Sequence, residues 1–174
     1  DGASAALLDA ARAAPDRADY VEKATLLRRV QALRRVAESG QDAPAAERAV
    51  ASLHLFYLQH DLPGLAVEAD RKAHERLPSG DTAARLAEAL LATGENADVT
   101  TVVAPYSASS VRHATYHAIA LARMGYTEQA TRLLERAPVA EEAPPAERYD
   151  RARALAALGR TDEALALLVQ CSER

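Results

Sequence analysis

The chain has 174 residues, of which 49% are hydrophobic and 26% charged, and its formal net charge is −4. This composition excludes an intrinsically disordered chain, and the mild acidic charge argues against nucleic-acid binding, which relies on a basic excess. Aromatic residues make up only 4%, so the core must be built mainly from Ala, Leu and Val. No apolar run approaches the roughly 20 residues of a transmembrane helix, which predicts no direct membrane insertion.

The single cysteine, Cys171, excludes an internal disulfide and a cysteine-based zinc cluster. It follows Leu168 by three residues in an apolar pattern, so we interpret it as a small core residue. The sequence begins at Asp1 without Met, which favours a processed chain or a piece of a longer one. These residues do not fix the compartment; the cytoplasm is favoured over the periplasm.

Apolar residues at helical spacing predict ten antiparallel helices, and no alternating strand pattern competes with them. The first two span 3–14, before Pro15, and 18–38, before Gly40, and they form a divergent hairpin over residues 1–44. The other eight are expected at 44–60, 63–77, 81–93, 96–104, 110–124, 127–137, 146–158 and 161–172. The Pro-rich stretch 138–147 is interpreted as a loop, so 1–174 is predicted to be one domain.

An internal repeat is visible in the last third of the chain, where 123-RMGYTEQATRLLERAP-138 returns as 157-ALGRTDEALALLVQCS-172. Gly125 and Gly159 hold the same place in the two copies and are expected to adopt the left-handed conformation that ends a helix. Thr127 and Thr161 are expected to be the N-caps of the helices that follow. The corresponding turn positions earlier in the chain are held by Gly94 and Asp61.

This pattern resembles the tetratricopeptide repeat, a helical hairpin of about 34 residues, and the two glycines are separated by one such length. The resemblance covers four units within residues 45–174, and it places the family's second-helix alanine and closing proline on Ala66, Ala130, Ala164 and Pro78. Departures include the family's tryptophan, which is replaced by Val50, Ala83, Ala114 and Arg148. Sel1-like and other helical-hairpin repeats are alternatives. The resemblance implies an all-α, right-handed α-solenoid of about five antiparallel hairpins.

In such repeats the first helix of each hairpin lines a concave groove. The resemblance therefore implies a partner-binding set that is rich in Arg and Tyr, the residue types enriched at binding hot spots. Arg side chains also bind carboxylates bidentately, whereas the alternative interpretation is that these side chains are ordinary solvated groups. The predicted set is Arg48, Gln59, Arg85, Glu88, Arg112, Thr115, Tyr116, Arg123, Tyr149 and Arg153.

Two features were candidates for chemistry. His113 and His117 are four residues apart on one predicted helix, but no third metal ligand accompanies them, so packed histidines are favoured. Ser107, Ser109 and Ser110 lack the Gly-x-Ser-x-Gly sequence of a nucleophile elbow. We therefore predict no catalytic residues, no metal site and no cofactor.

The function expected from these observations is that of a protein–protein interaction or scaffolding module, which binds a protein or peptide segment in its concave groove. Two alternatives stay open. One is a non-catalytic regulatory segment of a larger multidomain enzyme, and the other is a self-assembly module that stacks through its terminal helices.

Overall fold

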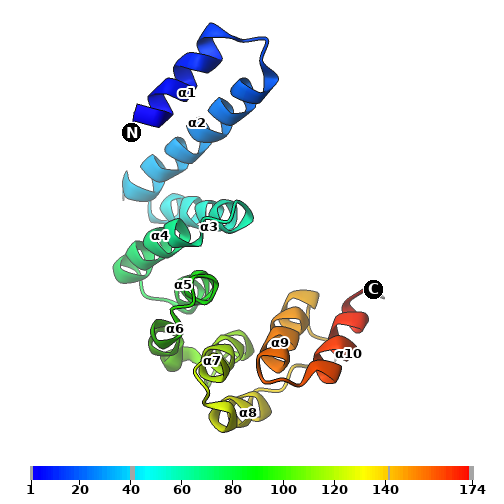
Figure 1. Ribbon diagram of the computed structural model, residues 1–174. Helices are drawn as coiled ribbons and strands as arrows, with labels where there is room; N and C mark the ends of the chain where they lie inside the picture. The colour runs from blue at the N-terminus through cyan, green and yellow to red at the C-terminus, as the bar shows by residue number, and fades with distance from the viewer. Residues whose placement is uncertain (1, 40–41, 141, 173–174) are drawn as a thin grey trace. The chain divides into compact units, whose positions relative to one another are not determined.

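The computed structural model describes residues 2–39, 42–140 and 142–172, and in this part of the chain the secondary structure consists of helices joined by turns and loops, without strands (Figure 1). The ten predicted helices are confirmed, and each observed boundary lies within one residue of the predicted one. The elements are α1 (Gly2–Ala13), α2 (Ala18–Ser39), α3 (Ala43–Gln59), α4 (Pro63–Arg76), α5 (Gly80–Thr93), α6 (Asn96–Val103), the 3-10 helix η1 (Ala104–Tyr106), α7 (Val111–Arg123), α8 (Thr127–Arg136), α9 (Pro145–Ala157) and α10 (Thr161–Ser172). The side chain of Cys171 lies outside the described part of the structure.

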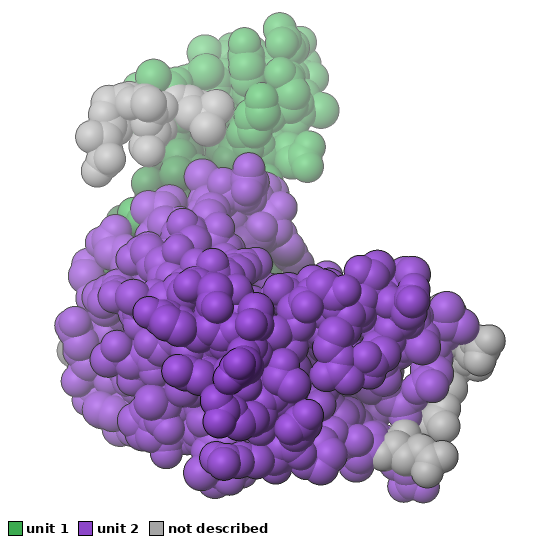
Figure 2. Space-filling model, turned by 60° about the horizontal axis from the view of Figure 1, so that its bottom comes forward, with its two compact units in different colours: residues 1–56 green, residues 57–174 purple. Residues whose placement is uncertain are grey.

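The chain divides into two compact units, residues 1–56 and 57–174 (Figure 2). The division falls inside α3. In the first unit α1 packs along α2 (Figure 1), and Ala11 and Ala24 are buried. In the second unit helices pack against their neighbours in sequence, as α4 with α5, α5 with α6, α6 with α7, α7 with α8 and α9 with α10. The single domain over 1–174 and the right-handed superhelix stay predictions.

The same left-handed turn occurs at four places. Asp61, Gly94, Gly125 and Gly159 have positive φ angles of 55°, 83°, 88° and 75°, as expected for these turn positions. After each of them, an N–H bonds to the carbonyl five residues earlier, which closes a Schellman motif. These bonds join Leu62 to Tyr57 at 2.8 Å, and Glu95 to Leu90, Tyr126 to Leu121 and Arg160 to Leu155 at 2.9 Å.

The turn geometry corrects the predicted helix caps. Thr127 is the first residue of α8, and the cap position is held by Tyr126 without a side-chain hydrogen bond. Thr161 is likewise the first residue of α10. The residue directly after each of these glycines closes the turn and also holds the N-cap position of the next helix. The cap therefore falls one residue before the threonine. A reciprocal capping box exists instead at α5, between Ser79 and Thr82.

The first helices of successive hairpins pack against one another, since α7 contacts both α5 and α9, and these helices bury many alanines. A short side chain lets two helices approach closely, because interaxial distance depends on the residues at the contact. The fully or almost fully buried alanines of these three helices are Ala83, Ala84, Ala87, Ala89, Ala114, Ala118, Ala120, Ala152 and Ala154. As a result α5, α7 and α9 hold their outward faces next to one another.

Arg151 connects α9 to the end of α8. Its guanidinium donates to the carbonyl oxygens of Leu134 at 2.9 Å and Ala137 at 3.2 Å, at the end of α8. The Leu134 carbonyl also accepts the N–H of Ala137, the residue that caps α8. Arg148, which is 6% exposed, donates through Nε to the carbonyl of Ala143 at 3.1 Å. The connection between α8 and α9 is thus held at both of its ends by arginines of α9.

A buried ion pair joins α4 to α5 and provides a test of the packing. Arg85 Nε lies 3.3 Å from Asp70 Oδ1, and the two side chains are 14% and 0% exposed. Removing one partner leaves a buried charge uncompensated, so we expect Arg85→Met to lower the free energy of unfolding by about 3–5 kcal/mol. Urea denaturation measures this difference.

The double variant Asp70→Leu/Arg85→Met is the control, and it should recover most of the lost stability because an apolar pair leaves no buried charge. Arg132→Met, which removes an exposed pair with Glu128, should change the free energy of unfolding by less than about 0.5 kcal/mol. An Arg85→Met effect as small as that of Arg132→Met would contradict the assignment.

Candidate functional site

An open pocket of about 440 Å³ lies on the outward faces of α5, α7 and α9 in the second unit, and we call it the α5–α7–α9 pocket. Arg112 and Tyr116 are one helical turn apart on α7, as are Tyr149 and Arg153 on α9, so each pair shares one face of its helix. Five residues of the predicted partner-binding set line this pocket. The complete lining is Glu88, Arg112, Tyr116, Pro144, Ala146, Glu147, Tyr149, Asp150 and Arg153.

On the α5–α7 side, three polar side chains form a closed triangle. Arg112 donates from Nη2 to Glu88 Oε2 at 3.2 Å and from Nε to Tyr116 Oη at 3.1 Å. The Tyr116 hydroxyl donates to the same Glu88 oxygen at 3.4 Å. Tyr116 is almost fully buried, with 1% exposed, so it anchors the two partially exposed side chains above it. The triangle is therefore a preformed wall of the pocket.

On the α9 side, Arg153 pairs with Asp150 through Nη1 and Oδ1 at 3.2 Å. The same guanidinium lies 5.9 Å from the centroid of the Tyr149 ring, within the range of a cation–π contact. Tyr149 is 54% exposed. It is therefore the aromatic surface of the pocket that a binding partner could reach.

Two buried groups in this pocket have raised pKa values. Burial raises the pKa of the Tyr116 hydroxyl far above its usual value, and the nearby Glu88 carboxylate raises it further. Burial also raises the pKa of the Asp150 carboxyl; Arg153 opposes this shift and Glu88 adds to it. In both groups burial disfavours the charged form, and the Glu88 carboxylate disfavours a second negative charge beside it.

Three other predicted residues serve the packing of the fold. Arg85 is occupied by its buried pair with Asp70. Thr115 is 1% exposed, and its hydroxyl donates to the carbonyl of Val111 at 2.8 Å. Arg123 donates from Nη1 to the carbonyl of Leu91 at 2.7 Å and so ties α7 to α5. None of the three lines the pocket.

The remaining two predicted residues also lie outside it. Arg48 is exposed on the part of α3 that belongs to the first unit, and Gln59 is exposed at the end of α3 in the second unit. Sequence reasoning missed Glu147 and Asp150. For Asp150 the spacing contains the signal, because it precedes Arg153 by three residues and follows Ala146 by four, which places these three residues on one helical face.

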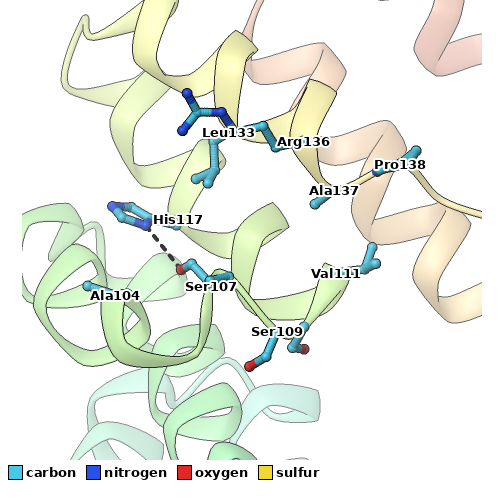
Figure 3. A pocket seen from close by; sticks show the side chains of 11 residues that line it. Ala104, Ser107, Ser109, Val111, His117, Leu133, Arg136, Ala137 and Pro138 are labelled. Carbon is cyan, nitrogen blue, oxygen red and sulfur yellow. Dashed lines mark hydrogen bonds between the residues drawn. The ribbon is translucent and has the colours of Figure 1, made fainter.

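A second pocket, also about 440 Å³, is formed between the turn after α6, the start of α7 and the end of α8 (Figure 3). His117 Nδ1 lies 3.1 Å from Ser107 Oγ, and the Ser107 hydroxyl donates to the carbonyl of Val103 at 2.8 Å. Because the single hydroxyl proton is used in that bond, Nδ1–H of His117 is the donor to Ser107. This direction is the reverse of the one in which a base activates a serine nucleophile.

His113 has a separate environment. It is 6% exposed, its Nε2 donates to the carbonyl of Gly80 at 2.8 Å, and its ring lies 5.1 Å from that of Tyr106. The two histidines therefore contact different partners, in agreement with their interpretation as packed residues. Within the described ranges, no group of three or more His, Cys, Asp or Glu side chains is arranged to hold a metal ion.

Comparison of the chain with protein-family models, with curated proteins and with solved structures finds no match. None of the helices in the described ranges combines the length and apolar character that a bilayer crossing requires. What is established for the described residues is an all-helical fold of ten α-helices packed in sequential pairs, with an open pocket lined from three of them.

His117 gives a pH dependence that can be measured. Burial lowers the pKa of His117 below its ordinary value of 6.5, so the unfolded chain binds this proton more readily than the folded one. The stabilising contribution is complete above the unfolded pKa and is lost as the pH falls toward the folded pKa. We expect His117→Gln to reduce the loss of stability between about pH 7 and about pH 5, as measured by urea denaturation.

Thr101→Gln provides the control, because Thr101 is exposed and carries no titratable group, so the pH dependence should stay as it is in the wild type. Equal pH dependence in the wild type and in His117→Gln would show that the burial of this imidazole does not affect its titration.

Proposed function

We propose that the second unit is a protein–protein interaction module that docks a partner segment in the α5–α7–α9 pocket. The observation that carries the proposal is the convergence of Glu88, Arg112, Tyr116, Tyr149 and Arg153 around one open cavity. These residues come from the first helices of three successive hairpins. Such a module acts as a scaffold and not as a catalyst.

The physical character of the pocket supports this role. Its volume lies within the range of about 300–1,000 Å³ that is typical of ligand pockets. The triangle of Glu88, Arg112 and Tyr116 is formed without a partner, so binding does not require these side chains to be ordered anew. Tyr149 offers a large aromatic surface of the kind found at binding hot spots.

We further propose that the hairpins of the second unit are tetratricopeptide-like repeats of a right-handed solenoid. The support is the return of the Gly125 motif at Gly159, one repeat length later, and the identical turn closure at four positions. A regulatory segment of a larger enzyme would use the same docking surface, so this alternative differs only in what the chain is attached to.

A peptide selection tests the docking role. A phage-displayed library of random peptides is selected against the whole chain, and the affinities of the peptides obtained are measured by fluorescence anisotropy. We expect Tyr149→Ser to weaken them at least about tenfold, because the exposed ring would be a binding hot spot. Tyr126→Ser is the matched control, since Tyr126 is 53% exposed and lines neither pocket.

Either of two results would overturn the proposal. One is a selection that yields no peptide above background. The other is a set of peptides that bind the wild type and Tyr149→Ser equally well, which would place their binding site elsewhere.

The outer face of α10 favours self-assembly as a second function. Leu165, Leu168 and Val169 are 55%, 37% and 54% exposed, although they lie at helical spacing on one face. Leu134 occupies the position equivalent to Leu168 in the preceding copy of the repeat and is fully buried. The equivalent position inside the array is therefore covered, and a second copy of the chain would cover this face in the same way.

Sedimentation velocity tests self-assembly. We expect the weight-average mass of the wild type to rise with concentration, and Leu165→Lys to stay monomeric because a charged group in the contact would be desolvated. Leu77→Lys, at an equally exposed leucine after α4, should behave as the wild type. A wild-type mass that is independent of concentration removes this function.

A further inference from the structure

The charges that line the α5–α7–α9 pocket do not balance. Each arginine already has a carboxylate of its own, as Arg112 pairs with Glu88 and Arg153 with Asp150, both at 3.2 Å. Glu147 is the third carboxylate of the lining, and it makes no ion pair with any part of the chain that the structure describes. Three carboxylates and two guanidinium groups leave the pocket with one excess negative charge at neutral pH.

An acidic ligand would meet an energetic obstacle here. A ligand carboxylate that binds Arg112 or Arg153 would share the guanidinium with Glu88 or Asp150, whose side chains are only 30% and 13% exposed. It would therefore lie close to a partially buried negative charge, and two carboxylates at one site repel each other. Burial is the main cause of the raised pKa values of the Tyr116 and Asp150 side chains, and the neighbouring Glu88 carboxylate adds to both shifts.

A basic ligand meets no such obstacle. Its positive charge can approach the Glu147 carboxylate without breaking an existing pair. The Tyr149 ring, which also lines the pocket, is half exposed and already lies within cation–π distance of one guanidinium, which shows that its surroundings tolerate a cation near the ring. A cavity of about 440 Å³ also has room for one long side chain.

We infer that the α5–α7–α9 pocket accepts a lysine or arginine side chain of the partner segment, which pairs with Glu147 and lies against Tyr149. This inference rests on the docking role proposed above and specifies the chemistry of the partner. It also changes the part that the arginines play. The sequence led us to expect Arg112 and Arg153 to bind the partner's carboxylates, whereas here they hold the carboxylates that shape the pocket.

The test uses the peptides selected on the wild-type chain, together with variants of each peptide in which single basic residues are replaced by Gln or by Glu. We expect the selected peptides to be rich in Lys and Arg. At one basic position, replacement by Gln should lower the affinity of the peptide about fivefold or more, which corresponds to the loss of about 1 kcal/mol or more from one charged contact. Replacement by Glu at the same position should lower the affinity further.

On the protein side, Glu147→Gln should weaken the selected peptides about fivefold and Glu147→Lys more strongly, since reversal adds repulsion to the lost attraction. Glu75→Gln, an equal change of charge at an exposed residue of α4 outside the pocket, is the control and should bind as the wild type. Raising the ionic strength from about 50 mM to about 300 mM should weaken the wild-type complex and have a smaller effect on the Glu147→Gln complex.

The outcomes separate this inference from the docking role. If the selected peptides are neutral or acidic, or bind Glu147→Lys as tightly as the wild type, the inference of a basic partner side chain is wrong. If Tyr149→Ser still weakens these peptides, the proposed docking role stands. If Tyr149→Ser also binds them as the wild type does, both the inference and the docking role are wrong. Circular dichroism of every variant confirms that the helices are intact, so a loss of binding is assigned to the pocket only for folded protein.

Discussion

The packing of α7 against both α5 and α9 is the constraint on which the rest of the second unit depends. These helices bury many alanines, among them Ala84, Ala118 and Ala154, and a larger side chain at such a buried position would strain the packing. Because the three helices pack side by side, side chains that are separated by a whole hairpin in sequence reach one another. The pair of Glu88 with Arg112 and the shared lining by Tyr116 and Tyr149 follow from this spacing.

The repeated turn supplies the second requirement, which is a constant direction of the chain between helices. A positive φ followed by the same closing hydrogen bond gives each hairpin a similar geometry. At three positions the turn uses glycine, which adopts this conformation without steric cost. Asp61 adopts it as well, which carries a cost for a residue with a β-carbon. Packing and turns together keep the first helices in register along the second unit.

Helices and turns could be predicted because their signals are local: apolar spacing defines a helix, and glycine marks its end. The caps were misplaced because Thr127 belongs to a turn whose closure already uses Tyr126. The helix faces of the candidate site were also predictable, whereas the partners of its charges were not. Arg112 and Glu88 are 24 residues apart, and Arg123 uses a backbone carbonyl as acceptor. Such pairings depend on the tertiary arrangement and on rotamers, which no sequence pattern encodes.

Arg151 has a consequence for how this molecule opens. It donates to two carbonyls at the end of α8 from a position on α9, so separating the two helices also removes these two hydrogen bonds. Loss of order at the end of α8 and detachment of α9 are therefore energetically coupled. In amide hydrogen exchange the two hairpins would open as one cooperative unit rather than as independent repeats. The hydrogen bonds of Arg151 thus couple the unfolding of one hairpin to that of the next, across a connection that is proline-rich in sequence.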